Sequence, residues 1–252
     1  MWLVERDAGF ATQCPVPRPP DPRTIDIWFQ LTDSLSEDEL ARLLTGLSSH
    51  ERTRHDRFVF ARDRRDFAAA HALLRRSLSR YADVSPAEWT FVEEPGGKPA
   101  LASHPAVPPL SFNLSHTHGL VACAIAGGQR IGVDVEPVHR TVDEGVAARF
   151  FSDAENAGLR GCATPLERAQ RFCELWTLKE AYIKAIGKGL SHPLNTIVFE
   201  IGEDGAIGFT APDDVDVALW RFGLFTPAEG YRLAVAVEGT CVADSPFRCL
   251  PG

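Results

Sequence analysis

Two five-residue stretches decide the fold: Val121-Ala122-Cys123-Ala124-Ile125 and Leu233-Ala234-Val235-Ala236-Val237, which lie 112 residues apart. Each is an unbroken apolar run, a pattern that predicts a strand. The helical stretches that begin at Arg65 and Arg171 recur at a similar offset of 106 residues. Because a helix and a strand recur in the same order, the sequence predicts two similar halves with an α+β fold.

The two halves are expected to span residues 1–130 and 131–252. A chain of 252 residues is long enough for one large domain or for two of roughly 100–130 residues. Helices are expected over Ala61–Tyr81 and Arg171–Ile186, where apolar residues recur at helical spacing. A site that draws on both halves would lie in the cleft between them.

The composition is that of an ordinary globular protein, with 44% hydrophobic and 24% charged residues. No apolar run approaches the roughly 18 residues that a membrane helix needs. The first ten residues, MWLVERDAGF, carry charges where a signal peptide needs an apolar core. The net charge of −8 argues against non-specific nucleic-acid binding. We therefore expect a cytoplasmic protein that binds neither membrane nor nucleic acid.

The six cysteines give no metal or redox motif, because none forms a C-x-x-C pair. We expect reduced structural thiols, in keeping with a cytoplasmic protein. The even count leaves three disulfides as the alternative, although a chain of this length does not need them.

One segment departs from the acidic balance of the chain. Residues 48–82 hold nine arginines and four acidic residues, a local excess of +5 in a chain of net charge −8. A solvated helix face with ion pairs along it explains such a cluster. An anion-binding site on an otherwise acidic protein is the alternative.

The strongest chemical signal is a pair of carboxylates at the end of a predicted strand, Ile131-Gly132-Val133-Asp134-Val135-Glu136. Asp134 and Glu136 are two residues apart, so on a strand they lie on one face. Two neighbouring carboxylates repel each other unless a cation sits between them. Hard oxygen ligands suit Mg²⁺, with Mn²⁺ as a substitute. A solvent-facing strand end without a metal is the alternative interpretation.

A second signal follows 46 residues after Asp134, where Glu180 opens an i,i+4 pair with Lys184 on a predicted helix. A surface ion pair is the simple explanation. Leu175, Leu178, Ala181 and Ile183 are expected to form the buried side of this helix. Glu180 and Lys184 are then expected at its edge, where a site opens.

A third signal is Asn113-Leu114-Ser115-His116, which we expect to enter a polar turn between two apolar strands. Such a turn offers hydroxyl, imidazole and backbone donors to an anion. A capped loop without a ligand is the alternative. The chain contains no P-loop, G-x-G-x-x-G, H-E-x-x-H or G-x-S-x-G motif. The signals together describe a site for Mg²⁺ and a phosphorylated ligand.

The order of these motifs resembles the 4′-phosphopantetheinyl transferases of the surfactin-synthetase-activating type. Their signature is (V/I)-G-(V/I)-D followed by W-(S/T/C)-x-K-E-(S/A)-x-x-K, and Ile131–Asp134 and Trp176–Lys184 match every position. Gly97-Lys98-Pro99 and Phe112–His116 are similar to the same family. The resemblance covers roughly residues 50–240 and implies two α+β halves related by a pseudo-twofold axis, with the site in the cleft between them.

The resemblance also implies the reaction. The 4′-phosphopantetheine arm of coenzyme A moves to a serine of an acyl or peptidyl carrier protein, and 3′,5′-ADP leaves. A monomer is expected, because two fused halves supply the cleft that a dimer would otherwise make. The implied residues are Asp134, Glu136 and Glu180 for Mg²⁺; Glu180, Lys184 and Asp134 for catalysis; and Arg54, Gly97, Lys98, Pro99, Asn113, Ser115, His116 and Lys184 for coenzyme A.

The family pattern is incomplete at one position. Some relatives carry a second basic residue three positions before the one that matches Arg54, where this chain has Glu51. Arg52 or Arg57 is the alternative contact for the 3′-phosphate.

Two other functions stay open at this point. One is a binder of coenzyme A or of a carrier protein without catalysis, and the other is a Mg²⁺-dependent phosphotransferase with a small acceptor. For the carrier protein we expect a docking surface between Pro137 and Gln170, a segment that mixes apolar residues with arginines. Pairing of those arginines with acidic residues of the same segment is the alternative. The residues concerned are Val142, Val146, Phe150, Phe151, Leu159, Arg140, Arg149, Arg160 and Arg168.

Overall fold

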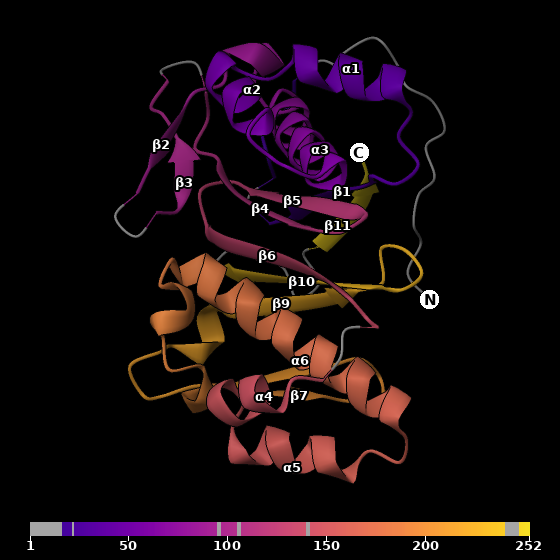
Figure 1. Ribbon diagram of the computed structural model, residues 1–252. Helices are drawn as coiled ribbons and strands as arrows, with labels where there is room; N and C mark the ends of the chain where they lie inside the picture. Colours follow the sequence, from indigo (N-terminus) through magenta and orange to yellow (C-terminus); the bar gives the residue numbers. More distant parts are fainter. Residues whose placement is uncertain (1–16, 22, 95–96, 105–106, 140–141, 240–246) are drawn as a thin grey trace. The chain divides into compact units, whose positions relative to one another are not determined.

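The computed structural model describes residues 17–21, 23–94, 97–104, 107–139, 142–239 and 247–252 (Figure 1). The chain divides into two compact units. Unit 1 comprises Met1–Gln129 and Cys241–Gly252, and unit 2 comprises Arg130–Thr240. The interpretations of residues 1–10, of Cys14 and Cys241 and of Arg140 lie outside the described residues.

Unit 1 is built on a sheet in which the described strands run in the order β11-β1-β5-β4. β11 is parallel to β1, and the other neighbours are antiparallel. β2 and β3 form a separate hairpin. The elements of unit 1 are β1 (Ile25–Leu31), α1 (Glu37–Thr45), α2 (Ser49–His55), α3 (Ala61–Leu78), β2 (Phe91–Glu93), β3 (Pro99–Leu101), β4 (Ser111–Thr117), β5 (Leu120–Ala126) and β11 (Phe247–Pro251), with a single 3₁₀ turn at Pro86–Glu88.

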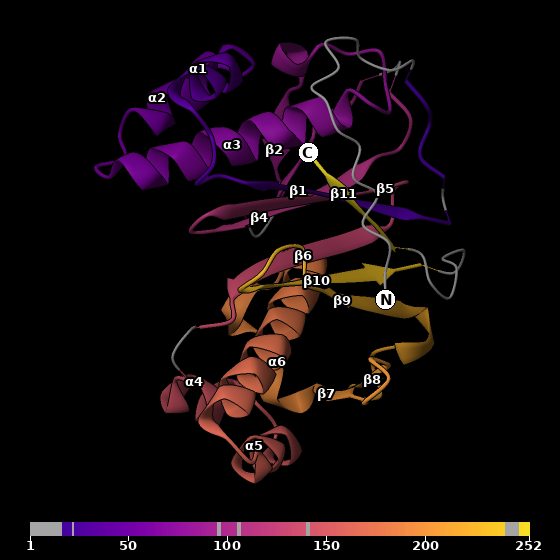
Figure 2. The same ribbon diagram turned by 90° about the vertical axis from the view of Figure 1, so that its right-hand side faces the viewer.

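The long helix α3 covers one face of this sheet (Figures 1 and 2). Phe67, Leu74 and Leu78 of α3 are buried with Phe112 of β4 and Val121 of β5 in one core cluster. Their spacing along α3 is the helical period that the sequence shows. The helix ends at Leu78, three residues before the predicted end.

Unit 2 repeats the plan with a sheet in the order β6-β10-β9, in which all neighbours are antiparallel. β7 and β8 form a separate hairpin. The elements of unit 2 are β6 (Arg130–Pro137), α4 (Glu144–Phe150), α5 (Asp153–Gly161), α6 (Pro165–Ile186), β7 (Val198–Ile201), β8 (Ile207–Thr210), β9 (Trp220–Phe225) and β10 (Tyr231–Glu238), with 3₁₀ turns at Gly189–Ser191, Leu194–Thr196 and Val217–Leu219.

The two units share one connectivity. In unit 1 a first strand is followed by α1–α3, a small hairpin and two strands, and the sheet pairs β1 with β5 and β5 with β4. In unit 2 a first strand is followed by α4–α6, a small hairpin and two strands, and the sheet pairs β6 with β10 and β10 with β9. The prediction of two similar α+β halves is confirmed. Their twofold relation and the cleft between them stay predictions.

The structure differs from the expected boundaries at two places. We expected the second half to continue to residue 252, but β11 pairs in parallel with β1 and belongs to unit 1. Helix α6 begins at Pro165 rather than near Arg171, because the Thr164 side chain accepts a hydrogen bond from the backbone of Glu167 and proline is favoured in the first turn.

The described cysteines agree with the expectation of reduced thiols. Cys123, Cys162, Cys173 and Cys249 are all free. Burial raises the pKa of Cys173 and of Cys249 to about 11, so neither is a thiolate at neutral pH. Among the described helices, none is long and apolar enough to cross a membrane.

Candidate active site

The site is built where helix α6 packs on strand β6. Gly132, Asp134 and Glu136 alternate along β6, so their side chains share one face of the strand. A Cβ atom on Gly132 would lie 2.0 Å from the carbonyl oxygen of Ala181 and 2.4 Å from the backbone nitrogen of Ala185. Only glycine therefore allows α6 to approach β6 this closely, and the face that carries Asp134 and Glu136 is the face that meets α6.

Side-chain hydrogen bonds connect the carboxylates of the strand to the helix. The Trp176 indole donates a hydrogen bond to Glu136 Oε1 at 3.0 Å. Lys184 Nζ donates to Asp134 Oδ1 at 2.6 Å. Trp176, Glu180 and Lys184 recur every four residues, so Glu180 lies on the same stripe of α6 between the two contacts. The predicted sharing of one helix face is thus correct, and both Glu180 and Lys184 are partly exposed at its edge.

The apolar side of α6 is also as predicted, since Leu175, Leu178, Ala181 and Ile183 are all buried. The three carboxylates offer oxygen donors only, which is the donor chemistry that Mg²⁺ and Mn²⁺ prefer. In the part of the chain that the structure describes, no group of three His, Cys, Asp or Glu side chains is arranged to hold a metal ion. The donor types therefore fit a hard cation, while the three side chains are not gathered at one point.

Sequence reasoning missed the role of Lys179, the residue directly before Glu180. Lys179 is fully buried and pairs with Glu155 at 2.9 Å. Its ammonium also donates to the carbonyl oxygens of Leu194 at 2.8 Å and of Ile197 at 2.7 Å. Burial lowers the pKa of Lys179, and the Glu155 carboxylate opposes that shift. The three bonds hold α5 and the segment after α6 against the helix that carries Glu180.

The interpretation of Ser115 and His116 as part of a turn is wrong. Strand β4 continues through both residues to Thr117, and the chain turns at Gly119, whose φ of 84° is in the region that favours glycine. Ser115 pairs with Ala122 and His116 with Val121 in an unbroken ladder.

The strand also separates the predicted anion-binding side chains. Side chains alternate along β4, so Asn113 and Ser115 lie on one face and His116 on the other. Asn113 and Ser115 are buried, whereas His116 is exposed. Because apolar runs flank these polar residues, the sequence favours a polar turn between two strands at this place.

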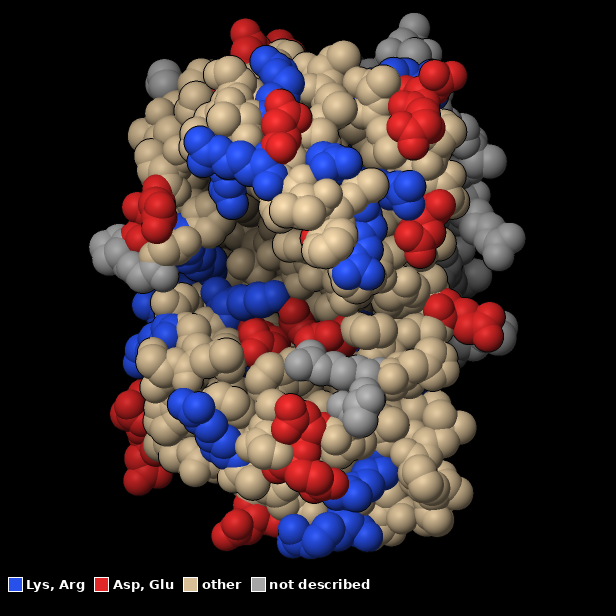
Figure 3. Space-filling view, viewed as in Figure 1, with Lys and Arg blue, Asp and Glu red and all other residues tan. Residues whose placement is uncertain are grey.

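The arginine cluster has two kinds of member. Arg54 is exposed on α2, and its guanidinium lies 5.4 Å from the ring centroid of Phe67. Arg75 is buried and pairs with Glu51 at 2.8 Å. Arg52 donates to the carbonyl oxygen of Leu47. Figure 3 shows basic side chains gathered over α2 and α3 on this face of unit 1. Ion pairing therefore accounts for Arg75, and an anion-binding site at the exposed arginines stays a prediction.

Glu51 has a structural role. It forms a capping box with Ser48 at the start of α2, and it accepts bonds from His71 at 2.9 Å and from Arg75. Burial by itself raises the pKa of Glu51, but the bonds from His71, Ser48 and Arg75 outweigh it and lower that pKa to about 2. An acidic residue at this position thus stabilises the fold and contributes no positive charge to an anion site.

Gly97, Lys98 and Pro99 lie in the hairpin between β2 and β3. Gly97 has a φ of 86°, and the backbone nitrogen of Glu94 donates to the carbonyl oxygen of Lys98 at 2.9 Å. The expected turn is present at its described residues. All predicted coenzyme A residues except Lys184 thus belong to unit 1, and all predicted metal residues belong to unit 2.

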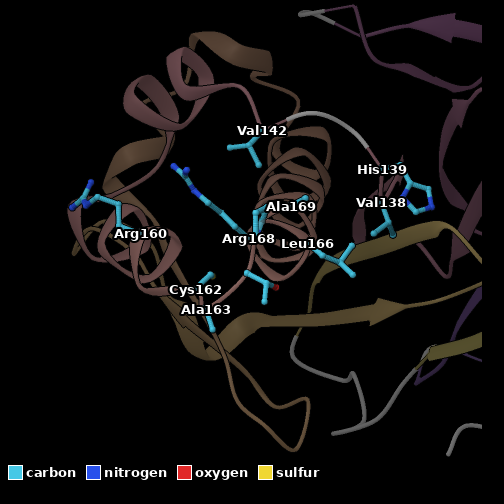
Figure 4. A pocket seen from close by; sticks show the side chains of 11 residues that line it. Val138, His139, Val142, Arg160, Cys162, Ala163, Leu166, Arg168 and Ala169 are labelled. Atoms are coloured by element: carbon cyan, nitrogen blue, oxygen red, sulfur yellow. The ribbon is translucent and has the colours of Figure 1, made fainter.

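The apolar side chains of the expected docking segment belong to the core. Phe150, Phe151 and Leu159 are buried, and Val142 and Val146 pack against the same core. A pocket of about 570 Å³ is present on this segment instead, beside the C-terminal end of α5 and the start of α6 (Figure 4). Its lining residues are Val138, His139, Val142, Arg160, Cys162, Ala163, Thr164, Pro165, Leu166, Arg168 and Ala169.

The arginines of this segment differ in their surroundings. Arg168 pairs with Glu144 at 2.6 Å, which is the pairing that we weighed as the alternative. The Arg149 guanidinium lies 4.9 Å from the ring centroid of Phe150. Arg160 is exposed beside the pocket.

Each of the two units matches a known family model. Residues 34–127 match the model of the N-terminal region of 4′-phosphopantetheinyl transferases, and residues 130–236 match that of the 4′-phosphopantetheinyl transferase superfamily. The chain is 38% identical over 205 residues to the 4′-phosphopantetheinyl transferase HetI of a Nostoc species, a match that covers 81% of this chain and 83% of that protein.

A second relative agrees. The chain is 31% identical over 213 residues to the 4′-phosphopantetheinyl transferase Sfp of Bacillus subtilis, covering 84% of this chain and 89% of that protein. A solved holo-(acyl-carrier-protein) synthase of Bacillus anthracis, in complex with coenzyme A (3′,5′-ADP), covers 44% of this chain and 96% of its own at 17% identity, with a TM-score of 0.37.

The chain belongs to the 4′-phosphopantetheinyl transferase family, the enzymes that move the phosphopantetheine arm of coenzyme A to a carrier protein. Within that family it is of the Sfp-like type.

Proposed function

We propose that the junction of β6 and α6 is where this transferase performs the transfer, and that Asp134, Glu136 and Glu180 bind Mg²⁺ there. The observation that carries the proposal is the packing of the stripe Trp176–Glu180–Lys184 on the strand face of Asp134 and Glu136, through bonds of 3.0 and 2.6 Å. A bound Mg²⁺ would neutralise charge on the pyrophosphate of coenzyme A.

Glu180 and Lys184 would have different roles in the transfer. Glu180 orients the serine hydroxyl of the carrier protein and accepts its proton. The serine oxygen forms a bond to the β-phosphorus, the bond from that phosphorus to the bridging oxygen breaks, and 3′,5′-ADP leaves with the electron pair. Lys184 stabilises the negative charge that develops on the leaving oxygen.

Coenzyme A binding is assigned to exposed groups of unit 1. Arg54 suits the 3′-phosphate, because its guanidinium is exposed and rests against the Phe67 ring. His116 suits a phosphate, and the hairpin residues Gly97, Lys98 and Pro99 suit the adenine. Asn113 and Ser115 are buried on the opposite face of β4 from His116, so they are the weaker members of the set.

The protein substrate is an apo acyl or peptidyl carrier protein. We propose that the enzyme acts as a cytoplasmic monomer without nucleic acid or membrane partners. A protein that binds coenzyme A or a carrier without catalysis is disfavoured, because such a protein has no use for the three carboxylates and Lys184. A phosphotransferase with a small acceptor is disfavoured by the family match.

The test is a transfer assay with coenzyme A, Mg²⁺ and an apo carrier protein, read by the mass of the carrier. We expect a gain of one phosphopantetheine arm, loss of the reaction in excess chelator, and recovery with Mg²⁺ or Mn²⁺. Asp134→Asn should lower the rate by about a thousandfold or more. Asp213→Asn, at an exposed loop position, is the matched control. Full activity in chelator would exclude the metal.

A further inference from the structure

The structure contains a second layer behind the carboxylates of β6. Trp176 is 6% exposed, and its ring packs edge-on against Phe150 with ring centroids 5.7 Å apart. From this buried position its only polar atom reaches Glu136 Oε1 at 3.0 Å. The indole N–H is a donor without acceptor capacity, so it fixes the orientation of the carboxylate that it meets.

We infer that Trp176 is a positioning residue that holds Glu136 for the cation, an inference that rests on the proposed function of the β6–α6 junction. A glutamate side chain has three rotatable bonds, and ordering them costs free energy when a ligand binds. The indole bond removes part of that freedom in advance. It uses one lone pair of Oε1, and a carboxylate has about four lone-pair sites, so acceptor capacity remains for a metal.

The two contacts follow from the spacing of same-face residues along helix α6 and strand β6. Successive same-face residues are about 6 Å apart on a helix and about 6.6 Å apart on a strand. On the strand face of Gly132, Asp134 and Glu136, one such step separates Glu136 from Asp134. On the helix, two steps separate Trp176 from Lys184, and the turn that carries Lys184 packs on Gly132, so the long lysine side chain reaches back to Asp134. Trp176 meets the Glu136 end of this face, and Lys184 meets Asp134. A tryptophan four residues before Glu180 is thus in the place from which a helix can orient the outer carboxylate of the strand.

Trp176→Phe tests the inference, because phenylalanine keeps the aromatic packing and removes the N–H. Trp220→Phe is the matched control: Trp220 is also 6% exposed in the unit 2 core, and its ring packs on Tyr182 and Phe222. The direct readout is Mn²⁺ binding to the protein without substrate, followed by electron paramagnetic resonance. The second readout is the Mg²⁺ dependence of transfer.

For Trp176→Phe we expect Mn²⁺ affinity to fall by about 10- to 100-fold, as for other residues that orient a metal ligand. The Mg²⁺ concentration for half-maximal transfer should rise in parallel, while the rate at saturating Mg²⁺ largely recovers. The KM for coenzyme A should stay unchanged at saturating metal, and Trp220→Phe should behave like the wild type. Equal Mn²⁺ affinity in Trp176→Phe and wild type would overturn the inference and leave the proposed function standing.

A wild type that binds no Mn²⁺ and transfers nothing would overturn the proposed function and this inference together. If Trp176→Phe does not fold, fluorescence of the wild type and of Trp220→Phe decides. Mn²⁺ quenches a tryptophan beside its site, so both proteins should lose the same emission on titration. Absence of quenching in a wild type that binds Mn²⁺ would place the metal away from Trp176 and overturn the inference.

Discussion

Lys184 Nζ lies 2.6 Å from Asp134 Oδ1, a contact that joins residues 50 positions apart in the sequence. The Asp134 side chain is 7% exposed and that of Lys184 is 30% exposed. A cation that approaches this oxygen meets the positive charge of the ammonium, which opposes its binding. Binding of a metal and release of Lys184 toward a phosphate are therefore coupled through one oxygen atom.

Replacement of Lys184 should separate its effect on metal binding from its effect on the transfer rate. Lys184→Met removes the competing charge, so the free protein should bind Mn²⁺ more tightly, by roughly tenfold or more, since two charges about 4 Å apart interact by about 1 kcal/mol in water and by more in a partly buried site. The same variant should lower the transfer rate by about 10²- to 10³-fold, because the leaving group loses its cation. Mn²⁺ titration and single-turnover transfer measure the two quantities. Lys184→Arg should recover part of the rate, and unchanged Mn²⁺ affinity in Lys184→Met would refute the coupling.

Arg54→Ala and His116→Ala should act mainly on coenzyme A binding. Both side chains are exposed, and under the proposed function they contact phosphates in the ground state as well as in the transition state, so their loss should raise KM more than it lowers kcat. Comparison of coenzyme A with 3′-dephospho-coenzyme A distinguishes the roles of the two residues. Arg54→Ala should weaken the binding of coenzyme A and leave the binding of 3′-dephospho-coenzyme A unchanged. Arg57→Ala is the companion variant. If it shows the selective loss and Arg54→Ala weakens both ligands equally, Arg57 contacts the 3′-phosphate.

Stability should decline in acid through Glu51. Its folded pKa of about 2 lies below the ordinary value of 4.5, so the carboxylate stabilises the fold above about pH 4.5. That contribution, about 3 kcal/mol at most, is lost as the pH falls from about 4.5 toward 2. In urea unfolding, Glu51→Gln should be less stable than wild type at pH 7, and the difference should shrink between pH 4.5 and 3.

The control for that experiment is Glu39→Gln, which removes the equivalent capping-box glutamate from α1 at a partly exposed position. It lacks the buried arginine partner and should change stability less. A Glu51→Gln deficit that stays constant down to pH 3 would show that charge is not its cause.

Arg160 offers a test of carrier docking on the predicted segment. It is exposed beside the pocket of unit 2, whereas Arg168 is paired with Glu144. An acidic carrier would be repelled by a chain of net charge −8, so attraction has to be local. Arg160→Glu should raise the KM for the carrier, more steeply at low salt, with coenzyme A affinity unchanged.

Arg42→Glu on α1 changes the net charge equally at another exposed position. An equal rise in carrier KM in both variants would assign the effect to overall charge rather than to docking at Arg160.

Local sequence patterns were sufficient to predict the main helices and the part of the candidate site that lies on β6 and α6. Helical spacing predicted α3 and the buried side of α6, and the i,i+4 pair put Glu180 and Lys184 on one face. The two-residue spacing of Asp134 and Glu136 put both on one face of β6. The same reasoning failed for Ser115, because a polar residue inside a strand has the sequence appearance of a turn. It gave no sign of the structural role of Glu51, whose buried partner Arg75 lies 24 residues away.

The sequence by itself determined what depends on neighbours within about four residues: helix periods, strand alternation and caps such as that of Ser48 on α2. Only the tertiary structure decided which distant groups meet. It paired β11 with β1, buried Lys179 against Glu155, and brought Trp176 to Glu136 across 40 residues. The physical reason is that backbone geometry repeats locally, whereas contacts between elements depend on packing, as in the close approach of α6 to β6 that the bare backbone of Gly132 permits.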